Sequence, residues 1–278
     1  MNYFKTTLLL IALAALLIWI GSMVGGMQGA MIAFIFTLIL NVGSFWFSDK
    51  IVLAMYRAQE MPEKDFPEVY EIVREIAGNA GIPQPKVYLI PQDAPNAFAT
   101  GRSPKNGVVC VTRGILNMLN RGELKGVVAH EMSHIKNRDT LIMTVTAVLA
   151  STIMMLVNMA RWTAMFGGRD DRNRNGGGIV GLLAMSILAP LAAMLIQLAI
   201  SRSREYGADA AGAKVAGSGN GLANALRKLN EASPRYRLNA SPQTAHLFIV
   251  NPLSGSFIAG LFSTHPPVEE RIKRLMKA

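Results

Sequence analysis

Cysteine and charged residues are both scarce in this sequence, and each scarcity limits what the protein can be. The chain has one cysteine, Cys110, among 278 residues, so it cannot form an internal disulfide. Charged residues make up only 17% and hydrophobic residues 51%, which is unlike an ordinary soluble domain. The apolar residues are concentrated in long runs, which indicates membrane spans. Cys110 lies in an apolar run that predicts a buried strand, so we expect it to pack in a core, and we expect the active site to face a reducing compartment.

Acidic residues are outnumbered by basic ones, but the excess does not indicate nucleic-acid binding. The formal net charge is +10. The basic residues are scattered, and no nucleic-acid-binding signature or basic stripe with interleaved aromatic residues occurs. Basic residues that flank membrane spans on the cytoplasmic side explain the sign of the charge.

Two apolar runs predict an N-terminal membrane hairpin in residues 1–48. The 43 residues between Lys5 and Asp49 are uncharged, which is room for two spans, at about 6–25 and 29–48, joined by a glycine-rich turn. Because a second span follows the first, the hairpin is expected to be a retained anchor and not a cleaved signal peptide. Basic residues flank the pair and the turn has none, so the positive-inside rule places both flanks in the cytoplasm.

Residues 49–139 are expected to form the first part of a cytoplasmic catalytic domain. The pattern predicts an amphipathic helix from Asp65, as N-cap, to Ala80. Proline and glycine bound three short predicted strands, at 87–90, 97–100 and 108–112. This part is therefore predicted to form a small α+β unit.

The stretch after these strands carries a zinc-peptidase signature. His130, Glu131 and His134 form the pattern H-E-x-x-H. Asn120 and Glu123 form a capping-box pattern ahead of it, and apolar residues then recur at helical spacing, which predicts a helix. Residues four apart share one face of a helix, so both imidazoles can bind one tetrahedral ion. Glu131, directly after the first histidine, is expected to lie near the reacting water. The chain has only 4 histidines, so a chance match to this pattern would be rare.

Residues 140–200 contain two further uncharged stretches, at about 140–160 and 179–200. Each is long enough to span a bilayer, and Pro190 in the second is tolerable as a kink in a membrane helix. The loop between them, 161–178, is glycine-rich and basic. If both stretches span, this loop lies outside, against the positive-inside rule. Full crossing, a re-entrant pair and a hairpin buried within protein all stay open.

The C-terminal part, residues 201–278, is expected to supply the third zinc ligand. A catalytic zinc has three protein ligands, and His134 is not followed by the glycine and third histidine of the extended signature. Glu205 and Asp209 lie four apart, so Glu205 can bind the metal while Asp209 orients a histidine. Alternatively, these carboxylates pair with neighbouring arginines on a solvated face. If Glu205 and His134 share an ion, the chain crosses the membrane an even number of times between them, and the site lies near the cytoplasmic membrane surface.

Three short motifs carry a family resemblance. They are His-Glu-Met-Ser-His at 130–134, Glu-Tyr-Gly-Ala-Asp at 205–209 and Ser-Thr-His-Pro-Pro at 263–267. Together with the four apolar stretches, they resemble the HtpX-type membrane zinc metalloproteases, a family that also includes the CAAX prenyl proteases. The resemblance covers nearly the whole chain. It implies that one zinc ion per subunit is held by His130, His134 and Glu205, with Glu131 as the catalytic carboxylate.

The resemblance also implies roles for less distinctive residues. His265 and Arg271 match a histidine and an arginine that approach the scissile carbonyl in related enzymes, which predicts that they stabilise the oxyanion. Asp209 is predicted to support a metal ligand through a hydrogen bond, and Asn137 and Asp139 are expected either to give such support or to end the helix. An edge strand to which an extended peptide can add is implied along the substrate cleft. Its substrate-binding residues are Asn96, Ala97, Phe98 and Ala99.

Taken with the predicted elements, the resemblance implies an α-helical integral membrane protein. Its catalytic domain is expected to be a mainly helical, α+β zincin-like fold with a small edge-stranded sheet and an H-E-x-x-H helix. The implied activity is that of a zinc metalloendopeptidase in the bacterial cytoplasmic (inner) membrane, acting at the cytoplasmic face on unfolded, damaged or unassembled membrane proteins under stress. Expected partners are the lipid bilayer and other membrane quality-control proteases, with no nucleic acid. A CAAX-type prenyl-protein processing peptidase and an inactive membrane scaffold are the alternatives.

Overall fold

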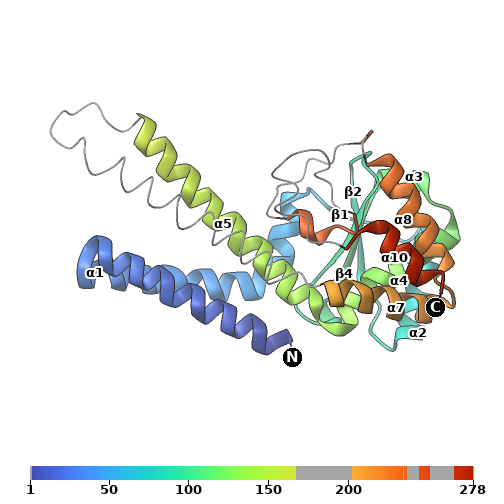
Figure 1. Ribbon diagram of the computed structural model, residues 1–278, viewed down its shortest axis with the longest axis horizontal. Coiled ribbons are helices and arrows are strands. Elements are labelled where there is room, and N and C mark those ends of the chain that lie inside the picture. Colours follow the sequence, from blue (N-terminus) through green and yellow to red (C-terminus); the bar gives the residue numbers. More distant parts are fainter. Residues whose placement is uncertain (1, 167–201, 234, 237–243, 251–265, 278) are drawn as a thin grey trace.

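The computed structural model describes residues 2–166, 202–233, 235–236, 244–250 and 266–277. Two long helical segments, α1 (Asn2–Met55) and α5 (Asp139–Phe166), extend from one side of a compact unit that holds the strands and the shorter helices (Figure 1). These two segments pack against each other. The H-E-x-x-H motif lies at the junction of the two parts, because α4 (Arg121–Asn137) leads directly into α5.

α1 folds back on itself at the glycine-rich turn that the sequence predicts. Gly26 has a φ of 55°, a left-handed conformation that glycine adopts without steric cost, and the ribbon of α1 reverses direction (Figure 1). The returning half, Gly26–Met55, is long and apolar enough to cross a membrane. Large apolar side chains are exposed along it, including Met27, Ile32 and Ile39. Lipid can cover apolar surface of this kind. That both halves of α1 span a membrane stays a prediction.

The compact unit contains a four-stranded sheet in the order β1-β2-β4-β3. Its strands are β1 (Gln59–Glu60), β2 (Lys86–Ile90), β3 (Ala97–Thr100) and β4 (Val108–Thr112). β2 and β4 are parallel, and the other neighbours are antiparallel. The three predicted strands are confirmed, and β3 is the last strand in the order. β1 was not predicted from the sequence. It has only two residues, both exposed, and so shows no alternation of apolar and polar side chains.

α2 (Pro67–Ala80) begins later than predicted. The N-cap prediction for Asp65 is wrong: Asp65 belongs to a preceding turn, and Phe66 takes the N-cap position without a side-chain hydrogen bond. The cause is the proline at 67, whose ring disfavours a helical conformation at the residue before it. The predicted end of the helix is confirmed, since Gly81 follows it in the left-handed conformation with a φ of 66°.

α4 is the helix around which the compact unit packs. The predicted capping box is confirmed: the Glu123 amide donates to Asn120 Oδ1 at 2.9 Å, and the Asn120 amide donates to Glu123 Oε2 at 3.0 Å. α4 contacts α2, β3 and two C-terminal helices, α7 (Arg202–Ala216) and α8 (Asn220–Ala232). Gly126 permits a close approach to α8, because a Cβ atom there would lie 2.3 Å from the backbone nitrogen of Leu222.

Short elements complete the described part of the compact unit. α3 (Arg113–Met118) leads from β4 towards α4, and α10 (Val268–Leu275) packs against α7 and α8. Two short 3₁₀ helices are present, η1 (Pro104–Asn106) and η2 (Ala245–Leu247). The segment containing η2 lies in the part of the chain between α8 and α10, and it returns to the sheet beside β3, where the Ile249 amide donates to the Ala97 carbonyl.

α5 forms a helix over the third apolar stretch, as the sequence predicts. Arg138, with a φ of 60°, separates it from α4, and the two helices meet at an angle of 88°. The first turns of α5 are buried, and the helix contacts α1, β3 and η2. Its crossing of a membrane stays a prediction. The fourth apolar stretch, 179–200, and the basic loop from residue 167 onward lie outside the described residues.

Candidate metal centre

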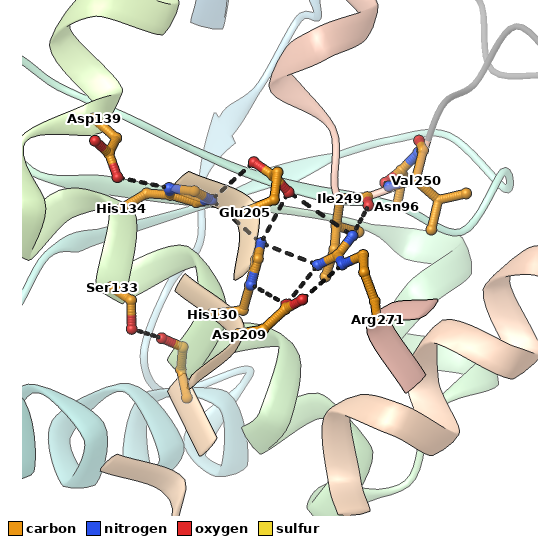
Figure 2. A network of polar contacts seen from close by, with 11 residues as sticks. Asn96, His130, Ser133, His134, Asp139, Glu205, Asp209, Ile249, Val250 and Arg271 are labelled. Atoms are coloured by element: carbon orange, nitrogen blue, oxygen red, sulfur yellow. Dashed lines mark hydrogen bonds and ion pairs between the residues drawn. The ribbon is translucent and has the colours of Figure 1, made fainter. Parts of the chain in front are cut away.

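Three side chains from two helices converge in the compact unit (Figure 2). The Nε2 atoms of His130 and His134, both on α4, lie 3.2 Å apart. Glu205, on α7, lies 3.8 Å from the first Nε2 atom through Oε2 and 3.4 Å from the second through Oε1. Ligand atoms about 2.05 Å from a tetrahedral zinc ion are separated from one another by about 3.3 Å. The nitrogen–nitrogen distance matches this spacing and a Glu205 oxygen lies close to each nitrogen, so this triangle of three side chains can hold one ion. The structure therefore brings together the three residues that the sequence predicts as ligands.

The alternative placement of Glu205 and Asp209 on a solvated face is wrong. Both carboxylates are buried, at 3% and 2% exposure. They face the histidines of α4 because α7 packs along that helix, and Gly212 allows the contact: a Cβ atom there would lie 3.0 Å from the backbone nitrogen of His130.

Each histidine is held by a carboxylate on its other ring nitrogen (Figure 2). His130 Nδ1 lies 3.0 Å from Asp209 Oδ1, as predicted, and His134 Nδ1 lies 3.1 Å from Asp139 Oδ2. Such contacts fix the orientation of each ring and leave Nε2 available for a metal. Asn137 is the last residue of α4 and is exposed, so it ends the helix, which is one of its two predicted roles; its support of a ligand stays a prediction. The bend that follows α4 brings Asp139 to the imidazole of His134.

Replacing Asp139 with alanine is expected to weaken zinc binding by about 10- to 100-fold, the usual effect of losing a partner that orients a ligating histidine. Titration of the purified protein against a chromophoric zinc chelator measures this change. Asp65→Ala is the matched control for the loss of an aspartate, because Asp65 is exposed in the turn before α2, and it should keep the wild-type affinity. Equal affinities in the two variants would remove Asp139 from the metal centre.

Negative charge makes the centre a favourable place for a cation. Burial lowers the pKa of His134, but the hydrogen bond with Asp139 and the charges of Glu205 and Glu131 outweigh burial and raise this pKa to about 9. In the metal-free protein these groups therefore stabilise a proton on His134. A divalent ion can take the place of that proton, since metal binding to histidine competes with protonation.

Glu131 connects the metal ligands to the sheet. Burial raises the pKa of Glu131 to about 7, and the nearby positive charge of His134 opposes this rise. The backbone amide of Ala99, on β3, hydrogen-bonds the carboxylate. A carboxylate with a pKa near neutrality is suited to taking and returning a proton. Glu131 thus combines a defined position with the acidity that a general base requires.

Arg271, on α10, lies behind the metal ligands. Its Nε and Nη2 atoms donate to the two carboxylate oxygens of Asp209 at 2.9 and 2.8 Å, and Nη1 donates to the Ile249 carbonyl at 3.1 Å. The residue is only 1% exposed. This two-point pairing fixes the carboxylate that in turn orients His130, so the observed contacts make Arg271 a positioning residue. Its implied contact with an oxyanion stays a prediction. His265 lies outside the described residues.

The predicted substrate strand is present, but its residues do not all face the site. Ala97 and Ala99 occupy the positions of the antiparallel ladder whose N–H and C=O groups point away from β4, to the outer edge. Phe98 pairs with Cys110 of β4 and is completely buried in an aromatic cluster, so its assignment to substrate binding is wrong. Cys110 is buried in the same layer, as expected. The side chain of Asn96 donates from Nδ2 to the carbonyl of Val250, in the segment that follows η2.

Two participants in this network carried no clear sequence signal. Asp139 lies beyond the end of the H-E-x-x-H helix, and an acidic residue in the first turn of a helix is common without any metal. Ile249 takes part through its backbone N–H and C=O groups, which every residue type except proline possesses. Only the folded chain shows that they border the site.

Known proteins resemble this chain over its full length. The family model described as peptidase family M48 matches residues 63–278. A "Protease HtpX homolog" of Syntrophobacter fumaroxidans is 58% identical over 275 residues, covering 98% of each chain. Another, of Pyrococcus furiosus, is 56% identical over 275 residues, covering 98% of this chain and 94% of that one. The crystal structure of S. mikatae Ste24p matches with a TM-score of 0.56 and 19% identity, covering 99% of this chain. This chain spans 65% of the Ste24p chain, and the likeness shows a shared fold alone.

Proposed function

This chain belongs to peptidase family M48 and is a metalloprotease, and we propose that it uses zinc to cleave unfolded, damaged or unassembled membrane proteins at the cytoplasmic face of a membrane. The observation that carries the proposal is the buried triangle of the His130, His134 and Glu205 side chains, whose ligand atoms are close enough together to hold one ion. Glu131 lies beside it as the general base that peptide hydrolysis requires.

The residues around the three metal ligands have separate roles in peptide hydrolysis. Bound zinc would supply a Lewis acid for water and for the peptide carbonyl. Glu131 takes a proton from the attacking water and passes it to the leaving amine nitrogen. Asp209 and Asp139 keep the imidazoles oriented throughout, so little reorganisation is needed when the substrate reacts. Arg271 keeps Asp209 in place.

An extended chain suits this site better than a folded one. The outward carbonyl group of Ala97 can pair with a peptide main chain without regard to its side chains, whereas the main chain of a folded segment is already paired. α5 leads from the site into the apolar part of the molecule, where it packs on α1 (Figure 1). A segment released from the bilayer would reach the site close to the ends of α1 and α5 that join the compact unit.

Charge supports placing the site on the cytoplasmic side. Lys5 lies before the apolar turns of α1, and Lys50 and Arg57 lie at its end, whereas the turn around Gly26 has no charged residue. The positive-inside rule assigns the ends of such a hairpin to the cytoplasm. The catalytic elements follow α1 directly and therefore lie on the same side.

Proteolysis by the full chain, purified in detergent, tests the proposal. Unfolded casein should be cleaved, cleavage should stop when a chelator removes the metal, and zinc should restore it. A protein that cleaves a prenylated CAAX peptide but not casein would instead be a prenyl-protein processing enzyme. Zinc-loaded protein that cleaves neither would favour a membrane scaffold.

A further inference from the structure

The edge of β3 that a substrate needs is already occupied in part. The backbone amide of Ile249 donates to the Ala97 carbonyl at 3.0 Å, and this carbonyl is one of the outward groups of the strand. The Asn96 side chain donates from Nδ2 to the Val250 carbonyl at 2.9 Å. Residues 249–250 therefore lie on β3 as a short additional strand would.

The first of these residues, Ile249, also reaches the network around the metal ligands. The Ile249 carbonyl accepts a hydrogen bond from Arg271 Nη1 at 3.1 Å, and the neighbouring Nη2 atom of Arg271 lies 3.4 Å from His130 Nε2. Three protein groups thus surround two consecutive peptide units: the Ala97 carbonyl, the side-chain amide of Asn96 and the guanidinium of Arg271. Figure 2 shows the last two. All three contact backbone atoms only, and a bound peptide of any sequence presents the same atoms at the same spacing.

We infer that the backbone of Ile249 and Val250 occupies the subsite that a substrate peptide takes beside the metal, so that the resting enzyme is blocked by its own chain. The inference rests on the proposed peptidase function. In it, Ala97, Asn96 and Arg271 are the groups that bind the substrate main chain, and the internal segment competes with the substrate for them.

We call residues 244–250 the blocking segment. Besides its contacts with β3, it contacts the C-terminal end of α1 and the first turns of α5. The hydroxyls of Thr244 and Tyr56, near the end of α1, are hydrogen-bonded. His246 Nε2 lies 3.0 Å from the Met143 carbonyl on α5. The Phe248 ring packs edge-on against Tyr56, with centroids 5.1 Å apart. A shift of α1 against α5 would therefore act on the segment directly, which links access to the cleft with the apolar part of the molecule.

Ile249→Pro tests the competition, because proline has no N–H to donate to the Ala97 carbonyl. The backbone accepts the change on the preceding side: Phe248 has φ −83° and ψ 148°, the extended conformation that a following proline favours. Ile249→Ala is the matched control, since it loses the side chain but keeps the N–H. We expect kcat/KM on unfolded casein to be about fivefold higher in the proline variant than in the alanine variant, the effect of one hydrogen bond. A kcat/KM in the proline variant equal to or lower than that of the alanine variant would show that the segment does not compete with substrate, and would overturn the inference.

Hydrogen exchange of the unmodified, zinc-loaded protein gives a second test that needs no turnover. The Ile249 amide should be protected in the free protein. A saturating octapeptide with a terminal hydroxamate should raise its exchange rate about tenfold or more, because the ligand displaces the segment. Unchanged or stronger protection with the ligand bound would overturn the inference. Failure of the wild-type protein to cleave casein would instead refute the proposed function, so the two failures are distinguishable.

Discussion

Replacing Glu131 with glutamine is expected to lower the rate of casein cleavage by about 10²- to 10⁴-fold, the contribution of a positioned general base. The amide is the same size and can still accept the hydrogen bond from the Ala99 amide. It cannot take a proton from water, so the chemical step loses its base. Initial rates on fluorescently labelled casein, at equal protein concentration, measure the loss.

Metal content is the control for this variant. Glu131 is not one of the three grouped ligands, so elemental analysis should find as much zinc in Glu131→Gln as in the wild type. A variant that cleaves casein at the wild-type rate would exclude Glu131 as the base. A variant that loses its zinc together with its activity would make Glu131 part of the metal-binding set.

Replacing Glu205 with alanine is expected to weaken zinc binding by more than about 100-fold, since even residues that only orient a ligand contribute about 10- to 100-fold. The variant removes the only ligand of the triangle that α7 contributes and leaves two imidazoles on α4. Elemental analysis after exhaustive dialysis measures the effect, and casein cleavage should disappear with the metal.

Glu75→Ala is the matched control for the loss of a glutamate. Glu75 is exposed on α2, where it pairs with Lys125 at 2.7 Å, and an exposed ion pair contributes little to stability. This variant should keep zinc and activity. Wild-type zinc content in Glu205→Ala after dialysis would contradict its assignment as the third ligand.

Local sequence was sufficient wherever the determining contacts are close along the chain. The start of α4 follows from the reciprocal hydrogen bonds of Asn120 and Glu123, three residues apart. The shared face of His130 and His134 follows from helical geometry. The glycine-rich turn in α1 follows from the backbone freedom of Gly26. Each of these features depends on residues within a few positions of one another.

The path of the backbone decided outcomes that residue type left open. Asp65 has the chemistry of an N-cap, but the proline at 67 moved the start of α2 past it. Asn137 stands closer in sequence to the ligands than Asp139 does, yet the 88° bend after α4 places Asp139 against the imidazole. In both cases the backbone path decided which residue took the position, and residue type alone did not.

The sequence by itself determined the chemistry of this protein: the ligand types, the general base, the apolar helices and the family to which the chain belongs. Helical spacing and hydropathy act over a few residues, so they can be read without coordinates. Tertiary structure alone decided that Asp139 supports His134, that Arg271 positions Asp209, and that Ile249 lies on the edge strand. Those contacts join residues that are far apart in sequence or separated by a bend, and they use charges and backbone groups that many other positions also offer. Only packing selects among them.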